Sequence, residues 1–227
     1  YLHTCATRNN QSLYCWGENV AGQLGVSGIA NASSPTRVGV AQWRSVSAGQ
    51  SHTCGIQGDG ALYCWGNNDA GKLGDGTTTS RPTPVRIGTA NDWASVSAGS
   101  SNTCALRTNG DIYCWGANTG STVVGDGTTT DRTSPVRVGA GRVWASVAVG
   151  RYVVAATDRA GQLFGWGDFT SSRTPVQIGS ASDWGPIATG SGHVCATRGD
   201  GTIQCLGNAY IGQLGSVTEV PTPIGQP

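Results

Sequence analysis

Charge, methionine and phenylalanine are scarce in this sequence. The 227 residues include no Met, two Phe and 12% charged residues, whereas soluble domains usually contain about 25% charged residues. The surface must therefore consist largely of Ser, Thr, Asn and Gly. A formal net charge of +1 gives no reason to expect nucleic acid as a partner. Because no apolar run of about 18 residues occurs, the sequence predicts no membrane span.

Residues that form catalytic or metal sites are scarce as well. The sequence contains two Glu and three His, and it has neither a Gly-x-Ser-x-Gly elbow nor a phosphate-binding loop. His3, His52 and His193 each stand two residues before a cysteine, and no carboxylate accompanies them. A ring of histidines could bind a metal, but a structural polar contact is the simpler interpretation. We therefore expect no cofactor, no metal and no enzymatic activity.

Eight cysteines form four pairs that share one spacing, with nine residues between the partners. The pairs are Cys5/Cys15, Cys54/Cys64, Cys104/Cys114 and Cys195/Cys205. A further copy of the surrounding sequence carries Ala155 and Gly165 at the two positions. A bonded pair predicts this joint loss, because a single remaining thiol would be reactive. We predict four disulfides, each local to its own repeat, and hence a protein of an oxidising compartment.

Two tryptophan motifs recur with the same rhythm. The first is Trp-Gly, replaced by Leu-Gly in the fifth copy, and it begins at Trp16, Trp65, Trp115, Trp166 and Leu206. The second opens a different segment and stands at Trp43, Trp93, Trp144 and Trp184. Both recur about every 50 residues, with a shorter last step of 40. A fixed period of this length predicts a repeat architecture. Its periodic aromatics are expected in the core rather than on a sugar-binding platform.

One repeat, from Trp43 to Asp92, contains four short segments rich in Val, Ile, Thr, Tyr or Trp and bounded by Gly, Pro, Asn or Asp. This punctuation predicts strands, and no stretch has the apolar period of a helix. Cys54 and Cys64 flank a turn centred on Asp59, so they should lie opposite each other on a hairpin, within disulfide range. We predict one four-stranded antiparallel sheet per repeat, and such small sheets must stack to bury their faces.

The chain divides into five units of a single array: 1–42, 43–92, 93–143, 144–183 and 184–227. The first unit begins inside its second strand and lacks the opening Trp segment. Together with the absence of Met, this indicates a processed or trimmed product. The missing strand should leave an open sheet edge, through which copies of the chain could self-assemble.

The repeat resembles that of a known family. The unit reads Trp-x-Ser-Val-x-Ala-Gly, then His-Thr-Cys, Asp-Gly, Tyr-Cys-Trp-Gly, Gly-x-Leu-Gly and Thr-Pro-Val-x-Ile-Gly. It is similar to the regulator-of-chromosome-condensation repeat over essentially the whole chain. The resemblance implies a β-propeller of four-stranded blades, usually seven in this family, of which this chain would supply four complete blades and one incomplete blade. The paired cysteines look most like the secreted bacterial branch of the family.

This resemblance does not by itself give the function, because one fold hosts many functions. The best-known family member is a nuclear guanine-nucleotide exchange factor, but disulfides and near-neutral charge argue against that role. Another member type is a secreted inhibitor of β-lactamase, and others are interaction modules fused to enzymes. All of them present loops on a rigid disc.

We therefore predict a non-catalytic binding scaffold, secreted or exposed at the cell surface, with the periplasm as an alternative location. Its partner would be a protein or a cell-surface polymer. Two other functions remain open. The chain could be a structural subunit of an extracellular filament or surface layer, or it could inhibit a secreted enzyme.

Recognition is expected in the polar loops after Trp-Gly, 19–34, 67–80 and 117–134, because loops on a rigid scaffold are common binding elements. The candidate residues are Asn19, Asn67, Asn68, Asp69, Asp75, Thr77, Asn118, Asp126 and Thr128. Two of the loops contain Asp-Gly-Thr-Thr-Thr, whose oxygens could bind Ca²⁺. This motif has a single carboxylate in each loop, so Asx and Ser/Thr turns are the simpler expectation.

Overall fold

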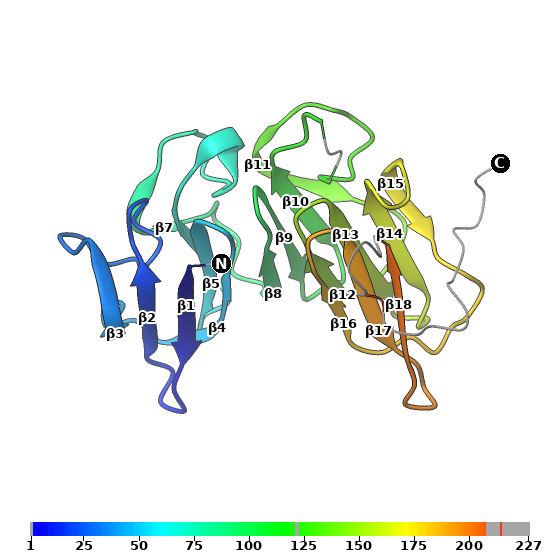
Figure 1. Ribbon diagram of the computed structural model, residues 1–227, viewed down its shortest axis with the longest axis horizontal. Coiled ribbons are helices and arrows are strands. Elements are labelled where there is room, and N and C mark those ends of the chain that lie inside the picture. The colour runs from blue at the N-terminus through cyan, green and yellow to red at the C-terminus, as the bar shows by residue number, and fades with distance from the viewer. Residues whose placement is uncertain (1, 121–122, 208–213, 215–227) are drawn as a thin grey trace.

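The computed structural model describes residues 2–120, 123–207 and 214. In this part the chain forms eighteen β-strands and one short 3-10 turn, η1 (Asp69–Gly71). The strands form five antiparallel sheets that follow one another in chain order (Figure 1). The predicted all-β fold of repeated small blades is therefore confirmed. No helix in the described part is long and apolar enough to cross a membrane.

Three of the sheets have four strands each. The second blade consists of β4 (Trp43–Ala48), β5 (His52–Gln57), β6 (Leu62–Gly66) and β7 (Arg81–Arg86). The third consists of β8 (Trp93–Ala98), β9 (Asn102–Arg107), β10 (Ile112–Gly116) and β11 (Arg132–Val138). The fourth consists of β12 (Trp144–Val149), β13 (Val153–Asp158), β14 (Leu163–Gly167) and β15 (Ser172–Gln177). Consecutive strands are neighbours in each sheet, so every blade is a meander.

The first and last sheets have three described strands each. The first consists of β1 (His3–Thr7), β2 (Leu13–Glu18) and β3 (Asn31–Arg37). The last consists of β16 (Ile187–Thr189), β17 (His193–Thr197) and β18 (Ile203–Gly207). Among the described residues the first sheet has no strand before β1, as predicted. The outer strand expected after Gly207 lies outside the described residues. Strand β16 is short because Pro186, directly before it, has no N–H to donate to the ladder.

The opening strands of successive blades lie next to one another. Strand β4 contacts β8, β8 contacts β12, and β12 contacts β16, which is the arrangement of inner strands around a propeller axis. Each of these strands is followed by a glycine, and successive glycines approach closely. A Cβ on Gly99 would stand 2.5 Å from the carbonyl oxygen of Gly150. The glycine at this position of the repeat therefore sets the spacing of the blades around the axis.

A buried tryptophan joins neighbouring blades at three places. In each case the indole Nε1 donates to a backbone carbonyl of the preceding blade. The pairs are Trp65 with Gln23 at 2.9 Å, Trp115 with Lys72 at 2.9 Å and Trp166 with Val123 at 3.0 Å. The repeated Gly-x-Leu-Gly segment leaves room for the indole ring. Its last glycine in the second blade, Gly74, has a φ of +80°, and a Cβ there would stand 2.6 Å from the Trp115 Nε1 atom. Only glycine meets both requirements.

Each of the four cysteine pairs is bonded across its own hairpin: Cys5 to Cys15, Cys54 to Cys64, Cys104 to Cys114 and Cys195 to Cys205. The partners stand directly opposite each other, with Cα separations of 4.0 to 4.1 Å. In the fourth blade the same register pairs Ala155 with Gly165. There the ring of Phe169 lies where a Cβ on Gly165 would be. An aromatic contact thus fills the space that a disulfide takes in the other hairpins.

Candidate binding face

The two ends of the blades carry different kinds of connection. At one end, the turn after each opening strand meets the loop after Trp-Gly. Hydrogen bonds of 2.9 Å join them, from the N–H groups of Asn67, Ala117 and Asp168 to the carbonyls of Ser51, Ser101 and Tyr152. At the other end lie tight hairpin turns, such as the one that closes from Gly60 N to Gln57 O. We call the first end the loop face and the second end the hairpin face.

A buried asparagine organises the long loop of the second blade. The side chain of Asn68 is fully buried. Its Nδ2 donates to the carbonyls of Thr77 and Thr79, both at 3.0 Å, and its Oδ1 accepts from the N–H of Leu73 at 2.9 Å. A single side chain therefore joins the two halves of the loop, which would otherwise leave buried backbone groups unpaired.

Asn19 and Asn118 hold the equivalent positions in the first and third blades. The Oδ1 of Asn19 accepts from Leu24 N at 2.9 Å, and that of Asn118 accepts from Val124 N at 3.1 Å. Their Nδ2 atoms also donate to loop carbonyls. The structure thus gives Asn19, Asn68 and Asn118 a role that differs from the predicted one. They are buried and shape the loops, so their side chains are not surfaces that a partner can touch.

Asp75 and Asp126 are similarly occupied by their own loops. The Oδ1 of Asp75 accepts from the N–H and the hydroxyl of Thr77, and its Oδ2 accepts from Arg81 Nε at 2.8 Å. Asp126 repeats these contacts with Thr128 and Arg132. Burial, the largest single effect, raises the pKa of Asp75, but the hydrogen bonds from Thr77 and Arg81 together hold the pKa below its ordinary value. These are the turn-forming contacts that the sequence favoured for both loops.

The exposed part of each loop begins one residue after the buried asparagine. That position holds Val20, Asp69 and Thr119 in the first three blades, and all three residues are exposed. Val20 is 84% exposed, which is unusual for a large apolar side chain. Of the predicted contact residues, Asp69 lies here, next to the half-buried Asn67 to which it is hydrogen-bonded. Sequence reasoning missed Val20 and Thr119, although alignment of the repeats shows a fixed Asn followed by a variable residue.

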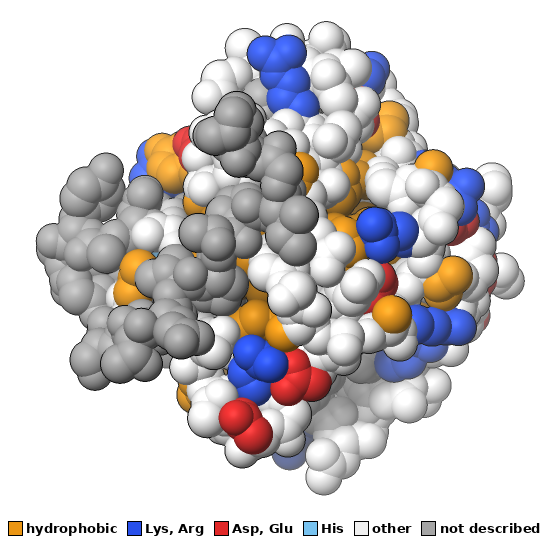
Figure 2. Space-filling view, turned by 90° about the vertical axis from the view of Figure 1, so that its right-hand side faces the viewer, with side chains coloured by type: hydrophobic (Ala, Val, Ile, Leu, Met, Phe, Trp, Pro, Cys, Tyr) orange, Lys and Arg blue, Asp and Glu red, His pale blue; other side chains and the backbone are white. Residues whose placement is uncertain are grey.

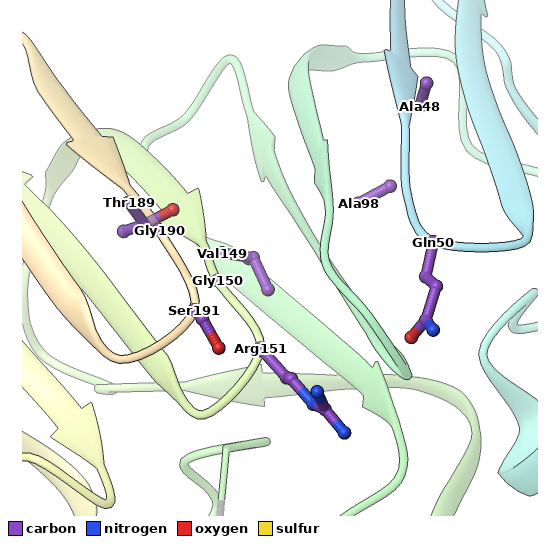
Figure 3. A pocket seen from close by; sticks show the side chains of 9 residues that line it. All are labelled: Ala48, Gln50, Ala98, Val149, Gly150, Arg151, Thr189, Gly190 and Ser191. Atoms are coloured by element: carbon purple, nitrogen blue, oxygen red, sulfur yellow. The ribbon is translucent and has the colours of Figure 1, made fainter. Parts of the chain in front are cut away.

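A cavity of about 530 Å³ opens where the inner strands end on the same face (Figure 3). It is lined by Ala48, Gln50, Ala98, Val149, Gly150, Arg151, Thr189, Gly190 and Ser191. These residues come from the ends of β4, β8, β12 and β16 and from the turns that follow. We call it the axial cavity. None of its residues was predicted, because their proximity depends on how four blades are arranged.

Charged side chains are scattered over the surface, and some of them form ion pairs. On the side of the molecule seen in Figure 2, the Lys, Arg, Asp and Glu side chains of the described residues stand interspersed among uncharged ones. Six ion pairs join an arginine to an aspartate in the described part. Such a surface favours hydrogen-bonded and aromatic contacts over electrostatic steering.

The predicted structural role of the histidines agrees with the positions of His3 and His52. The hydroxyl of Thr53 donates to the Gln23 carbonyl at 2.7 Å, so Nε2 of His3, which lies 2.9 Å from that hydroxyl, must be the donor to it. His52 repeats this contact with Thr103 of the third blade. Burial lowers the pKa of His3 to about 4 and that of His52 to about 3. Both rings are therefore neutral links between blades. Among the described residues no cluster of three His, Cys, Asp or Glu forms a metal site.

The blades, their inner strands and the loop face together define a β-propeller of sequence-related units. Residues 10–56 and 59–106 match the family described as "Regulator of chromosome condensation (RCC1) repeat", and a second profile of the same description matches residues 43–72 and 93–120. The fold is therefore a β-propeller, as the sequence predicted, and the matched segments, which cover less than half of the chain, are similar to the RCC1 repeat. The assignment to a secreted branch stays a prediction. No curated protein sequence matches the chain significantly.

Solved structures share this fold. Human WBSCR16 has 21% identity and a TM-score of 0.85, over 100% of this chain and 65% of that one. Yeast RCC1 (Prp20), solved bound to Kap60, has 20% identity and a TM-score of 0.84, over 99% and 59%. The ectodomain of the Physcomitrella patens receptor kinase CR4 has 22% identity and a TM-score of 0.61, over 91% and 49%. The chain thus spans less than two thirds of each, and these identities show the fold alone.

Proposed function

We propose that this chain is a non-catalytic scaffold, secreted or exposed at the cell surface, that binds a partner through its loop face. The observation that carries this proposal is the pattern within the loops. A buried asparagine fixes the same loop framework in three blades, while the next residue is exposed and different in each: Val20, Asp69 and Thr119. A rigid framework with variable exposed positions is typical of a recognition surface.

The location outside the reducing cytosol is supported by the disulfides. All four lie within hairpins of the blades, and structural disulfides persist in oxidising compartments. They brace short hairpins, which are only marginally stable alone, and so hold the loop face in one shape.

A protein partner is favoured over a polymer. The surface is nearly neutral, with its ion pairs formed internally, so it offers little attraction to a highly charged polymer. Yeast RCC1 (Prp20), which has the same fold, is bound to a protein, Kap60, in its crystal structure. An inhibitor of a secreted enzyme would be one form of such a scaffold.

Paired variants test the face. Val20→Lys with Thr78→Lys changes two exposed residues of the loop face, and Asn9→Lys with Thr108→Lys changes two exposed residues of the hairpin face. Both double variants add the same charge. The immobilised chain is exposed to the culture medium and surface extract of its own source, and recovered proteins are identified by mass spectrometry. We expect the loop-face variant alone to lose its partner. Equal recovery by both variants, or loss only in the hairpin-face variant, would contradict the proposal.

A further inference from the structure

The axial cavity has one apolar and one polar part. Ala48, Ala98 and Val149, the last residues of three inner strands, form the apolar wall. Gln50 and Arg151, from the turns that follow, also line the cavity, and their side chains extend toward the bottom of Figure 3, away from Ala48 and Ala98. The turns are tied to one another, since Gln50 N donates to Gly99 O and Tyr152 N donates to Ser191 O, both at 3.0 Å. The polar rim is therefore preorganised.

Arg151 is the one charged residue among the described residues that line this cavity. The equivalent position after the axial glycine is Gln50, Ser100 and Ser191 in the other blades, so the fourth blade alone adds a positive charge. The guanidinium lies 4.8 Å from the ring centroid of Tyr152, which limits its motion. Six other arginines form ion pairs with aspartates, whereas Arg151 has no such partner in the described part of the chain.

Gln50 and Ser191 add hydrogen-bond donors to the lining of the same cavity. The hydroxyl of Ser100 donates to Oε1 of Gln50, and this contact leaves the Nε2 hydrogens of Gln50 directed away from Ser100. The exposed hydroxyl of Ser191 lines the same rim. Because no Asp or Glu is among the described residues that line the cavity, a negative group that enters it would meet donors and no repelling carboxylate from this part of the chain.

From this geometry we infer that the axial cavity binds the carboxylate of an acidic side chain from a protein partner, with Arg151 as its anchor. The apolar wall suits the methylene groups that carry the carboxylate, and guanidinium–carboxylate pairs form strong, directional hydrogen bonds. This inference rests on the proposed binding function and specifies the chemistry of the partner residue that enters the axis.

The test uses small probes on the whole chain. N-acetyl-glutamate N-methylamide, the matching glutamine compound and glucuronate are titrated into ¹⁵N-labelled protein, and the amide shifts of Gly150, Arg151 and Gly190 are followed. We expect saturable shifts with the glutamate compound, with an affinity at least about tenfold above that of the glutamine compound. Arg151→Ser, which installs the residue of two other blades, should weaken the glutamate compound by about tenfold or more. Arg159→Ser, an exposed arginine on the hairpin face of the same blade, should leave binding unchanged.

Three results would overturn the inference: equal shifts with the glutamate and glutamine compounds, unchanged binding in Arg151→Ser, or saturable binding of glucuronate without binding of the glutamate compound. The failure of this inference is distinguishable from failure of the proposed function. If Arg151→Ser recovers the partner normally while Val20→Lys with Thr78→Lys does not, the loop face binds and the axial carboxylate site is wrong.

Discussion

The buried ring of His52 makes stability depend on pH between neutrality and pH 5. The ring is fully buried, and its Nε2 hydrogen is used on the hydroxyl of Thr103. Its Nδ1 has no hydrogen-bond partner in the described part. A proton added at Nδ1 would therefore place a charge in a site without an acceptor. Burial, then the nearby charges of Lys72 and His3, lower the pKa of His52 to about 3.

The sign and size of the effect follow from linkage. An unfolded chain has a histidine pKa of about 6.5, so between about pH 6.5 and pH 3 it binds a proton that the folded chain does not bind. The free energy of unfolding is therefore constant above pH 6.5 and falls as the pH is lowered. Between pH 7.5 and 5.0 the loss from His52 is about 2 kcal/mol. His3, whose folded pKa is about 4, contributes in the same direction.

The variant His52→Asn isolates this contribution. The strand register places Asn102 at the equivalent position of the third blade, where it is fully buried, so the site accepts Asn. Urea unfolding is followed by tryptophan fluorescence at pH 7.5 and pH 5.0. We expect the variant to lose about 2 kcal/mol less than the wild type over this interval. Comparing the two losses removes any cost of the substitution that does not depend on pH.

Thr103→Val is the matched control, because it removes the hydrogen-bond partner of His52 but keeps the titrating ring. This variant should be less stable at both pH values and should retain the pH-dependent loss. If His52→Asn loses as much stability as the wild type on acidification, the ring is not held neutral in the fold, and the reasoning is refuted.

Three further predictions concern stability and covalent structure. Cys54→Ser should lower the free energy of unfolding by about 2.5–3 kcal/mol. The double variant Cys54→Ser with Cys64→Ser should lose less of this free energy, because no free thiol remains to mispair. Equal losses of the two variants in urea unfolding would count against pairing. A triple variant should form a fifth hairpin disulfide; its substitutions are Ala155→Cys, Gly165→Cys and Phe169→Ala. The thiols of this variant are titrated after unfolding without reduction. If both new thiols are free, the fourth blade does not share the register of the other hairpins. Asn68→Ala should lower the free energy of unfolding by about 2–3 kcal/mol, because it leaves buried backbone groups of the loop unpaired. The control Asn67→Ala should lower it by less than about 0.5 kcal/mol. Similar thermal or urea midpoints for the two variants would contradict the structural role of Asn68.

The blades were predictable because their information is local. The spacing of Cys54 and Cys64 around one turn defines a hairpin register, and that register is found in all four disulfide-bonded hairpins. The ends of the strands could be predicted from Gly, Pro and Asn residues because these residues also act locally. The recurrence of Trp at fixed positions predicted buried packing, and Trp43, Trp65, Trp115, Trp144 and Trp166 are all at or below 2% exposure.

The roles of the loop residues were harder to predict because they depend on which hydrogen bonds are satisfied. A polar residue in a loop is usually predicted to lie on the surface. Asn68, however, recurs in the other repeats as Asn19 and Asn118, and a polar residue that recurs at one position of a repeat is often structural. The axial cavity is not local at all, since Gln50 and Arg151 are about a hundred residues apart in the sequence. Likewise, only the folded chain places Phe169 in the space left by the missing disulfide of the fourth blade.

Photo-crosslinking from the two faces tests the central claim, that the loop face is the binding surface, most directly. A photoreactive amino acid is introduced at Val20 on the loop face or at Thr108 on the hairpin face, and each protein is irradiated in the medium of its source. The account predicts a defined crosslinked species from position 20 and none from position 108. A crosslink from position 108 alone, or the same species from both positions, would contradict it.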